Sequence, residues 1–267
     1  MDGRIAARRL DAFDSPRATV VLCAPFGFTT EDMFLPALHL LRNGVSVVQF
    51  DPRNHHGMSD GDMRTYSLSS HAKDIATVVE AIPEQVIVVA LSLAARPALR
   101  VLAETPTAGG VVVTPVVWVE DSMRRVTGVD WYSLYRVSPE DVPDDIELLG
   151  HRMPRSSAPV DDEAGLLDMA GTLRDASAIS VPVHVIAGSD DDWVDLGDVR
   201  RVTEAMRSGT LHVLQAAGHK FYIHPKAAKE IFVGISTSVL DLAGVTQQVA
   251  VPRFREAIEL REELSRL

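Results

Sequence analysis

The chain has 267 residues, of which 46% are hydrophobic and 24% are charged, and these proportions exclude a disordered or collagen-like chain. Its single cysteine excludes an internal disulfide, and its net charge of −11 argues against the basic surface that nucleic-acid binding requires. No apolar run approaches the roughly 20 residues that span a bilayer, and no secretory signal follows Met1, so we expect a cytoplasmic protein without a membrane span.

Short runs rich in valine and isoleucine alternate along the chain with longer segments of helical periodicity. The runs predict buried strands at residues 18–25, 45–50, 85–91, 109–117, 181–188 and 211–218. The periodic segments predict helices at residues 31–44, 69–82, 93–104, 195–209 and 225–244. Strands that alternate with helices indicate an α/β fold, with a mostly parallel sheet covered by helices on both faces.

The alternation stops between Trp118 and about Ser180, where acids, prolines and bulky side chains replace strong strand signals. This stretch is far longer than an ordinary connection between two strands. We therefore expect a core of α/β architecture formed by residues 1–117 and 181–267, with residues 118–180 as a helical cap insertion. The C-terminal residues predict an amphipathic helix with Phe254, Ile258 and Leu264 on one face, packed on its own domain or, as the alternative, at a dimer contact.

A serine stands where the strand at 85–91 passes into the next helix. The local sequence Ala90-Leu91-Ser92-Leu93-Ala94 is a variant of the G-x-S-x-G nucleophile elbow, in which only small residues fit two positions before and after the serine. A buried serine that caps a helix would give the same pattern. The motif therefore makes Ser92 a candidate nucleophile without deciding the point.

Candidate partners for this serine follow two later strands. The strand at 181–188 leads into Asp190-Asp191-Asp192, and the strand at 211–218 leads into His219. Parallel strands bring their carboxyl ends to one edge of a sheet, and Ser, Asp, His is the chain order of this triad. We expect His219 to take the Ser92 proton while an aspartate orients the imidazole; the spacing favours Asp191 and leaves Asp190 and Asp192 open.

The sequence also indicates which groups form the oxyanion hole and whether another nucleophile or a cofactor is expected. The N–H of Leu93 is one expected donor, and the second comes from Phe26 or, as the alternative, from Gly27. Cys23 lies inside an apolar strand and is interpreted as a packed residue rather than a nucleophile. The sequence contains no phosphate-binding loop, dinucleotide fingerprint or zinc motif, so we expect no cofactor and no catalytic metal.

At these residues the chain resembles the α/β-hydrolase superfamily, and within it the acyltransferase and thioesterase family of bacterial luminescence systems. Ser92-Leu93 with Ala95-Arg96 resembles the family's elbow, although Ala94 replaces an expected serine, and Asp191-Asp192-Trp193-Val194 resembles its acid loop. Further similar positions are Phe50, Asp51, His55, Gly57, Ser59 and Gly61 after an early strand, and 130–132, 140–143, Gly150 and His151 in the insertion. The resemblance covers roughly residues 20–225.

The resemblance implies an enzyme that moves a long acyl chain from a carrier thioester through an acyl-serine intermediate. An acyl carrier protein is then a candidate partner, and Gly27, His55 and His151 are candidate substrate-binding residues, with structural or surface roles as alternatives for the histidines. An acidic carrier could dock on the arginines of the insertion, but we favour pairing of these arginines with neighbouring acids (Arg124, Arg125, Arg136, Arg152, Arg155). The alternatives are a carboxylesterase or biosynthetic hydrolase or cyclase with the same triad, and an inactive fold that binds an acyl ligand.

Overall fold

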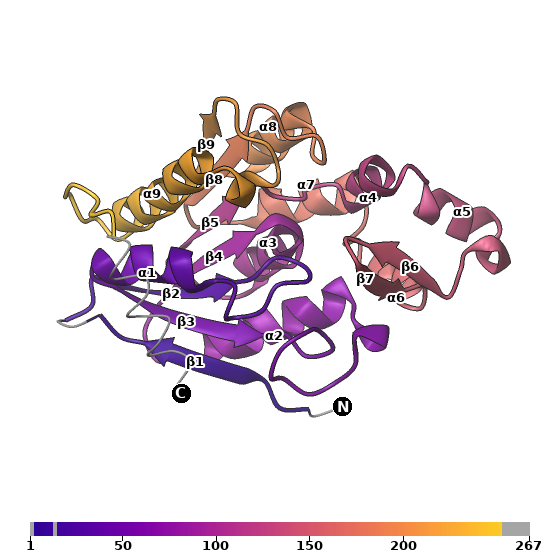
Figure 1. Cartoon of the computed structure of the whole chain (residues 1–267), viewed down its shortest axis with the longest axis horizontal. Coiled ribbons are helices and arrows are strands. Elements are labelled where there is room, and N and C mark those ends of the chain that lie inside the picture. Colours follow the sequence, from indigo (N-terminus) through magenta and orange to yellow (C-terminus); the bar gives the residue numbers. More distant parts are fainter. Residues whose placement is uncertain (1–2, 13–14, 253–267) are drawn as a thin grey trace.

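A computed structural model describes residues 3–12 and 15–252 and shows one seven-stranded sheet (Figure 1). The strand order is β1-β3-β2-β4-β5-β8-β9; β1 pairs antiparallel with β3 and every other pairing is parallel. The strands are β1 (Ala6–Leu10), β2 (Ala18–Cys23), β3 (Val45–Asp51), β4 (Ile87–Leu91), β5 (Gly109–Val113), β8 (Val183–Gly188) and β9 (Gly209–Leu214). The predicted mostly parallel sheet is confirmed, and every predicted strand is present with slightly different ends.

Helices cover both faces of this sheet and divide the hydrophobic core into two halves. On one face α1 (Phe34–Arg42) packs against α9 (Pro225–Leu242). The other face carries α2 (Leu68–Glu80), α3 (Ala95–Glu104), α7 (Met169–Ala178) and α8 (Leu196–Ala205), each packed against the next. Successive strand residues face opposite sides, so Val88 joins one half of the core and Val89 the other.

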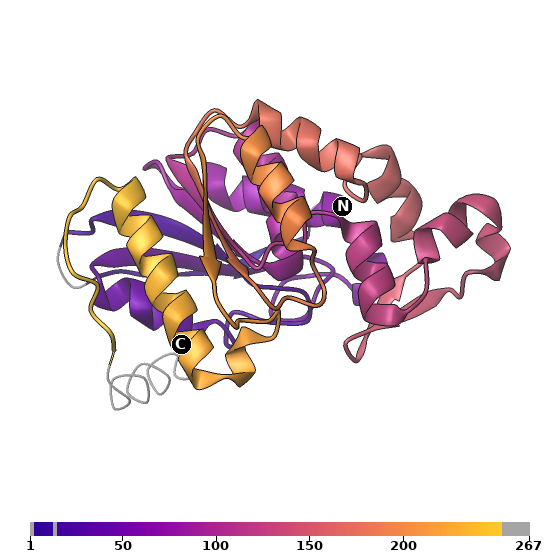
Figure 2. The same ribbon diagram turned by 90° about the horizontal axis from the view of Figure 1, so that it is seen from above.

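The insertion between β5 and β8 projects beyond the carboxyl ends of the strands, as Figures 1 and 2 show. It contains α4 (Val119–Thr127), α5 (Trp131–Val137), α6 (Ser157–Glu163) and a hairpin of β6 (Asp145–Leu148) and β7 (His151–Pro154). The sequence did not predict this hairpin, because its strands have only four residues each and β7 (HRMP) does not alternate polar and apolar side chains. Leu149 and Gly150 form its turn with φ angles of 56° and 81°, the handedness that suits a two-residue hairpin loop.

Two other differences concern the ends of the chain. The edge strand β1 was not predicted, because its half-exposed sequence AARRL contains two arginines and lacks the valine-rich pattern of the central strands. The predicted amphipathic helix with Phe254, Ile258 and Leu264 lies outside the described residues. Within the described ranges, none of the helices combines the length and the apolar character needed to cross a bilayer.

Candidate active site

Ser92 occupies a strained turn between β4 and α3. It begins the short 3-10 helix η2 (Ser92–Ala94) with φ of +53°, a left-handed conformation that non-glycine residues rarely adopt. Ala90 and Ala94 are fully buried on either side, and the Val116 N–H donates to the Ser92 carbonyl at 3.1 Å. The turn therefore presents the serine hydroxyl at the carboxyl edge of the sheet, and strain of this kind is typical of functional sites.

Two loops at the same edge bring an aspartate and a histidine to this serine. Asp191 follows β8 and His219 follows β9. The loops are tied together where Asp190 N–H donates to the Ala217 carbonyl at 3.0 Å, and Gly188 is required because any Cβ there would collide with that carbonyl. The parallel pairing of β8 with β9 therefore fixes the two side chains relative to each other.

The three side chains form a continuous hydrogen-bonded chain. Ser92 Oγ lies 2.7 Å from His219 Nε2, and His219 Nδ1 lies 2.9 Å from Asp191 Oδ2. The side chains of His219 and Asp191 are only 3% and 4% exposed. The Trp193 ring stacks on the imidazole, with ring centroids 4.4 Å apart. This arrangement allows the histidine to accept the serine proton while the carboxylate holds the ring.

Only one of the three consecutive aspartates contacts the histidine. The second oxygen of Asp191 accepts hydrogen bonds from the backbone N–H groups of Trp193 and Val194 at 2.9 and 3.0 Å. Asp190 is exposed and accepts from the Ser189 hydroxyl at 2.6 Å, and Asp192 is exposed. The geometry therefore brings Asp191 to the candidate site and leaves its two neighbours outside it.

The backbone N–H groups of Leu93, the next residue after Ser92, and of Phe26, which lines a cavity together with Ser92, have no acceptor among the described residues. The N–H of Gly27 is already engaged, because it donates to His55 Nε2 at 3.0 Å. Burial lowers the pKa of His55 to about 4, so this imidazole is neutral and can accept that bond. Of the two alternatives for the second oxyanion donor, Phe26 is free and Gly27 is not.

The predicted substrate-binding histidines lie around the Phe26 turn, and neither lines the two described cavities that Ser92 lines. His151 of β7 shares a hydrogen bond with His56, Nδ1 to Nε2 at 2.8 Å, and its ring packs against Gly27, whose φ is +82°. Both His55 and His151 contact the edge of the Phe26 ring, with centroids 5.5 and 5.8 Å away. Gly27, His55 and His151 thus support the turn that carries a candidate oxyanion donor.

Two cavities meet at Ser92, and Phe26, Ser92, Leu149 and Trp193 line both of them. The first, about 590 Å³ with the open space at its mouth included, reaches from His219 toward α1 and α9 and includes Phe28, Tyr222 and Phe232. The second, about 430 Å³ on the same basis, reaches into the insertion, where its lining is almost wholly apolar (Leu93, Val116, Val119, Met123, Val126, Leu148). His219 lines the first cavity and not the second.

Comparison with known protein families assigns this chain to one of them. A family model described as acyl transferase matches residues 10–223. The chain belongs to this acyl transferase family. Relatives include the acyl transferase of Photobacterium phosphoreum, 21% identical over 253 residues and covering 90% of this chain and 82% of the relative. The acyl transferase of Shewanella hanedai is 22% identical over 261 residues, with 93% and 83% covered.

Solved structures show that this acyl transferase family member has the α/β-hydrolase fold. Est1E from Butyrivibrio proteoclasticus, solved with ferulic acid bound, superposes with a TM-score of 0.72 at 15% identity and covers 90% of this chain and 96% of its own. A monoacylglycerol lipase of Paleococcus ferrophilus has a TM-score of 0.69 at 21% identity, with 91% and 100% covered. The predicted resemblance is confirmed, and family and fold together support an enzyme of acyl transfer or hydrolysis.

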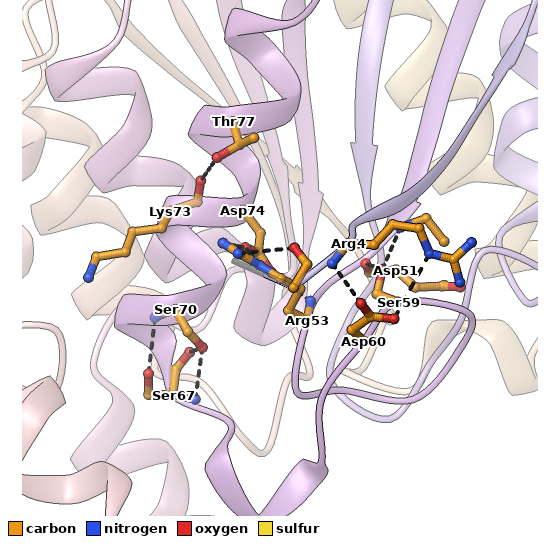
Figure 3. Close-up of polar contacts among 12 residues, drawn as sticks. Arg4, Asp51, Arg53, Ser59, Asp60, Ser67, Ser70, Lys73, Asp74 and Thr77 are labelled. Carbon is orange, nitrogen blue, oxygen red and sulfur yellow. Dashed lines mark hydrogen bonds and ion pairs between the residues drawn. The ribbon is translucent and has the colours of Figure 1, made fainter. Parts of the chain in front are cut away.

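Several residues that carried the resemblance to the acyl transferase family build the loop after β3. The buried Asp51 carboxylate accepts from Thr30 N–H and Met58 N–H at 2.8 and 2.9 Å, and the Asp51 carbonyl accepts from the Ser59 hydroxyl. Figure 3 shows how Arg53 anchors the start of the loop on the fully buried Asp74 of α2, with Nε to Oδ1 at 2.7 Å. This loop carries His55 and His56 to the Phe26 turn.

The arginines behind Ser92 and in the insertion form ion pairs within the protein. Arg96, fully buried after the elbow, pairs with Asp175 of α7 at 2.8 Å and donates to the Gly165 carbonyl at 2.7 Å. It therefore joins the helix behind Ser92 to the end of the insertion. The insertion's own arginines pair with nearby acids, as we favoured (Arg124 and Arg125 with Asp121, Arg136 with Glu120 and Asp162, Arg152 with Asp145, Arg155 with Asp144).

Thr114, which lines the first cavity, was not predicted from the sequence as a site residue. Thr114 follows β5, the strand between those that lead to Ser92 and Asp191, and it lines the cavity together with Ser92 and His219. A threonine at the end of a valine-rich strand resembles an ordinary strand residue, so nothing in the sequence marks it. Cys23, in contrast, is fully buried in β2, where burial raises the pKa of its thiol.

Proposed function

We propose that this protein is a serine-dependent acyltransferase or thioesterase, which takes a fatty or polyketide-type acyl chain from a carrier thioester. The observation that carries the proposal is the hydrogen-bonded chain of Ser92, His219 and Asp191, which opens onto two largely apolar cavities. Apolar cavities suit an acyl chain, because burial of each methylene contributes about 0.8 kcal/mol. Membership of the acyl transferase family supports the same class of reaction.

In the proposed acylation step, His219 Nε2 takes the Ser92 proton as the serine oxygen attacks the thioester carbonyl. The N–H groups of Phe26 and Leu93 stabilise the oxyanion that forms, and Asp191 stabilises the protonated imidazole. The carbon–sulfur bond then breaks, and the thiolate leaves with the proton from His219. Because a thiolate is a good leaving group, this step needs activation of Ser92 more than strong acid assistance.

In this scheme the two cavities bind different parts of the reacting molecules. His219 must reach both the leaving sulfur and the incoming nucleophile, and it lines only the first cavity. We therefore assign the leaving group and the nucleophile to the first cavity and the acyl chain to the second. In this scheme α4 to α6 and the β6–β7 hairpin act as a cap on the core, since α4 supplies much of the acyl cavity's wall. The helix α7, which also lies within the predicted cap of residues 118–180, packs against α3 and α8 on the face of the sheet instead.

The thioester carrier is either coenzyme A or an acyl carrier protein in this proposal. The arginines of the insertion all have carboxylate partners among the described residues. A surface on which the cations are already paired offers little net attraction to an acidic carrier. We therefore do not assign carrier docking to these arginines, and the test of the proposal uses both carriers.

The direct test is detection of the acyl-enzyme. Wild-type protein mixed with decanoyl-coenzyme A or a decanoyl-loaded acyl carrier protein should gain the mass of one decanoyl group, and Ser92→Ala should gain none and lose turnover. The exposed Ser208 between α8 and β9 provides a matched control, because Ser208→Ala should behave as wild type. Full turnover by Ser92→Ala would refute the proposal.

Two further measurements separate the alternatives. A carboxylesterase using the same residues would hydrolyse a decanoyl ester with a higher kcat/KM than either decanoyl thioester. An inactive fold that only binds acyl ligands would resist labelling of Ser92 by an alkyl phosphonate, because that reaction requires an activated nucleophile. Labelling of wild type and of Ser208→Ala, but not of Ser92→Ala, is the result expected for the proposed enzyme.

A further inference from the structure

Thr114 is the most unusual residue of the first cavity that the proposed mechanism does not use. It is 1% exposed, and its hydroxyl oxygen has no hydrogen-bond partner among the described residues. Buried hydroxyl groups are nearly always paired with protein or with ordered water. Thr114 lines the cavity that also contains Ser92 and His219, and its buried, unpaired oxygen would reach a molecule bound there once the side chain rotates toward the cavity.

The backbone of Thr114 is also strained. Its φ is +41°, a conformation that is a clear outlier for a β-branched residue. The position is fixed by the Thr114 N–H, which donates to the Ile186 carbonyl of β8 at 2.7 Å. Two residues later, the Val116 N–H binds the Ser92 carbonyl, so the segment after β5 is tied both to the nucleophile's turn and to the strand that leads to Asp191.

Packing alone accounts for neither feature. Thr114 is a polar residue among the apolar side chains of the cavity, such as Leu91, Phe221 and Phe232, where valine would fill the same volume without an unpaired hydroxyl. Strain and an unsatisfied polar group in one residue at the edge of a candidate active site point to a function. The ligand must be small or slender and must offer a hydrogen-bonding group near His219.

We propose that the Thr114 hydroxyl holds the water that hydrolyses the acyl-enzyme, an inference that rests on the proposed function. The water donates one hydrogen to His219 Nε2 and the other to Thr114 Oγ. Its oxygen attacks the carbonyl carbon of the acyl ester while the first hydrogen passes to His219 as a proton. The bond from that carbon to Ser92 Oγ then breaks, the serine oxygen regains the proton from His219, and the free acid leaves.

This role distinguishes water from an alcohol acceptor. An alcohol has one hydroxyl hydrogen, which His219 must take, so it has none left to donate to Thr114. The Thr114 hydroxyl therefore accepts a hydrogen bond from water, whereas to an alcohol it can only donate one, and it does so to the same oxygen that must attack. Thr114 is thus a positioning residue that favours hydrolysis over transfer to an alcohol.

The experiment compares Thr114→Val, which keeps the branched shape and removes the hydroxyl, with Thr114→Ser, which keeps the hydroxyl. Decanoyl-N-acetylcysteamine serves as substrate, with thiol release reporting acylation and intact mass reporting the acyl-enzyme. For Thr114→Val we expect an acylation burst at the wild-type rate, deacylation slowed by about tenfold, and a larger steady-state acyl-enzyme fraction. Thr114→Ser should restore deacylation, and Thr114→Ala provides a second variant without the hydroxyl if the valine form does not fold.

A second readout is the product ratio in the presence of added methanol. Loss of the hydroxyl should raise the ratio of methyl decanoate to decanoic acid, because only the reaction with water is slowed. Wild-type deacylation in both hydroxyl-free variants, or an equal fall in acylation and deacylation, would overturn the inference while leaving the acyl-Ser92 intermediate intact. Absence of any acyl-enzyme in wild type would instead overturn the proposed function, and the Thr114 role with it.

Discussion

Replacing Asp191 by asparagine should abolish most activity while leaving the fold unchanged, and the structure explains why. One carboxylate oxygen accepts from Trp193 N–H and Val194 N–H, and the other faces His219 Nδ1 at 2.9 Å. An asparagine must place its NH₂ group at one of these two positions. Toward the backbone it would face two N–H donors and leave them unpaired, at a cost of about 1–3 kcal/mol each.

The amide oxygen of the substituted side chain therefore stays on the backbone, favoured by about 2–6 kcal/mol, and the NH₂ group faces the imidazole. It then donates to Nδ1, so the ring proton must move to Nε2, the atom that should accept the Ser92 proton. Loss of the correct tautomer in a serine triad lowers kcat by roughly 10³–10⁴-fold. The free energy of unfolding should change by less than about 1 kcal/mol, because the hydrogen bonds to the backbone are retained.

The assay is kcat/KM for decanoyl-coenzyme A, with thermal denaturation as the measure of folding. Asp190→Asn and Asp192→Asn are matched controls, since both aspartates are exposed and neither contacts His219. We expect both controls to stay within about threefold of wild type, because exposed charges act weakly through solvent. A folded Asp191→Asn protein with near-wild-type activity would refute the tautomer argument, as would loss of activity in a control alone.

Two further predictions concern the turn that carries Phe26. Gly27→Ala should lower the free energy of unfolding by about 1–3 kcal/mol and should also lower kcat/KM, because the φ of Gly27 is +82° and a Cβ there would collide with the His151 ring. Chemical denaturation measures the first effect and turnover of decanoyl-coenzyme A the second. His55 is held below its ordinary pKa of 6.5, at about 4, by burial, so the folded protein binds fewer protons than the unfolded chain between these values. Stability should therefore fall as pH drops from 6.5 to about 4, by about 3 kcal/mol from His55, and His55→Gln should show a shallower fall in pH-dependent denaturation.

The sequence predicted the central sheet well because its strands are buried on both faces and are nearly continuous in valine and isoleucine. Elements with mixed patterns were missed: β1 contains two arginines, and the strands β6 and β7 have only four residues each, of which those of β7 (HRMP) do not alternate. The candidate site was also predictable in part, since Ser92, Asp191 and His219 each follow a predicted strand. Parallel pairing brings the carboxyl ends of these strands, and therefore the loops that carry the three residues, to one edge of the sheet.

What the sequence could not provide was side-chain geometry inside the turns. The spacing left Asp190, Asp191 and Asp192 as alternatives, and only the hydrogen bonds to His219, Trp193 and Val194 distinguish them. The same holds for the oxyanion donors, because Gly27 N–H is taken by His55, a residue 28 positions away in the chain. Contacts between distant loops leave no local pattern in the sequence, whereas strand and helix periodicity does.

The fold and the choice of substrate depend on different residues of this protein. The α/β-hydrolase fold supports many reactions, so its presence alone does not select a substrate. In the proposed assignment of the acyl chain to the second cavity, the selecting surface is one face of α4, where Val119, Ser122, Met123 and Val126 line that cavity at helical spacing. From the sequence this face is indistinguishable from ordinary packing, because a helix buries the same kind of stripe against a core. Since this stripe forms one wall of the space that begins at Ser92, the residues of α4, rather than those of the triad, should determine which acyl chains the enzyme accepts.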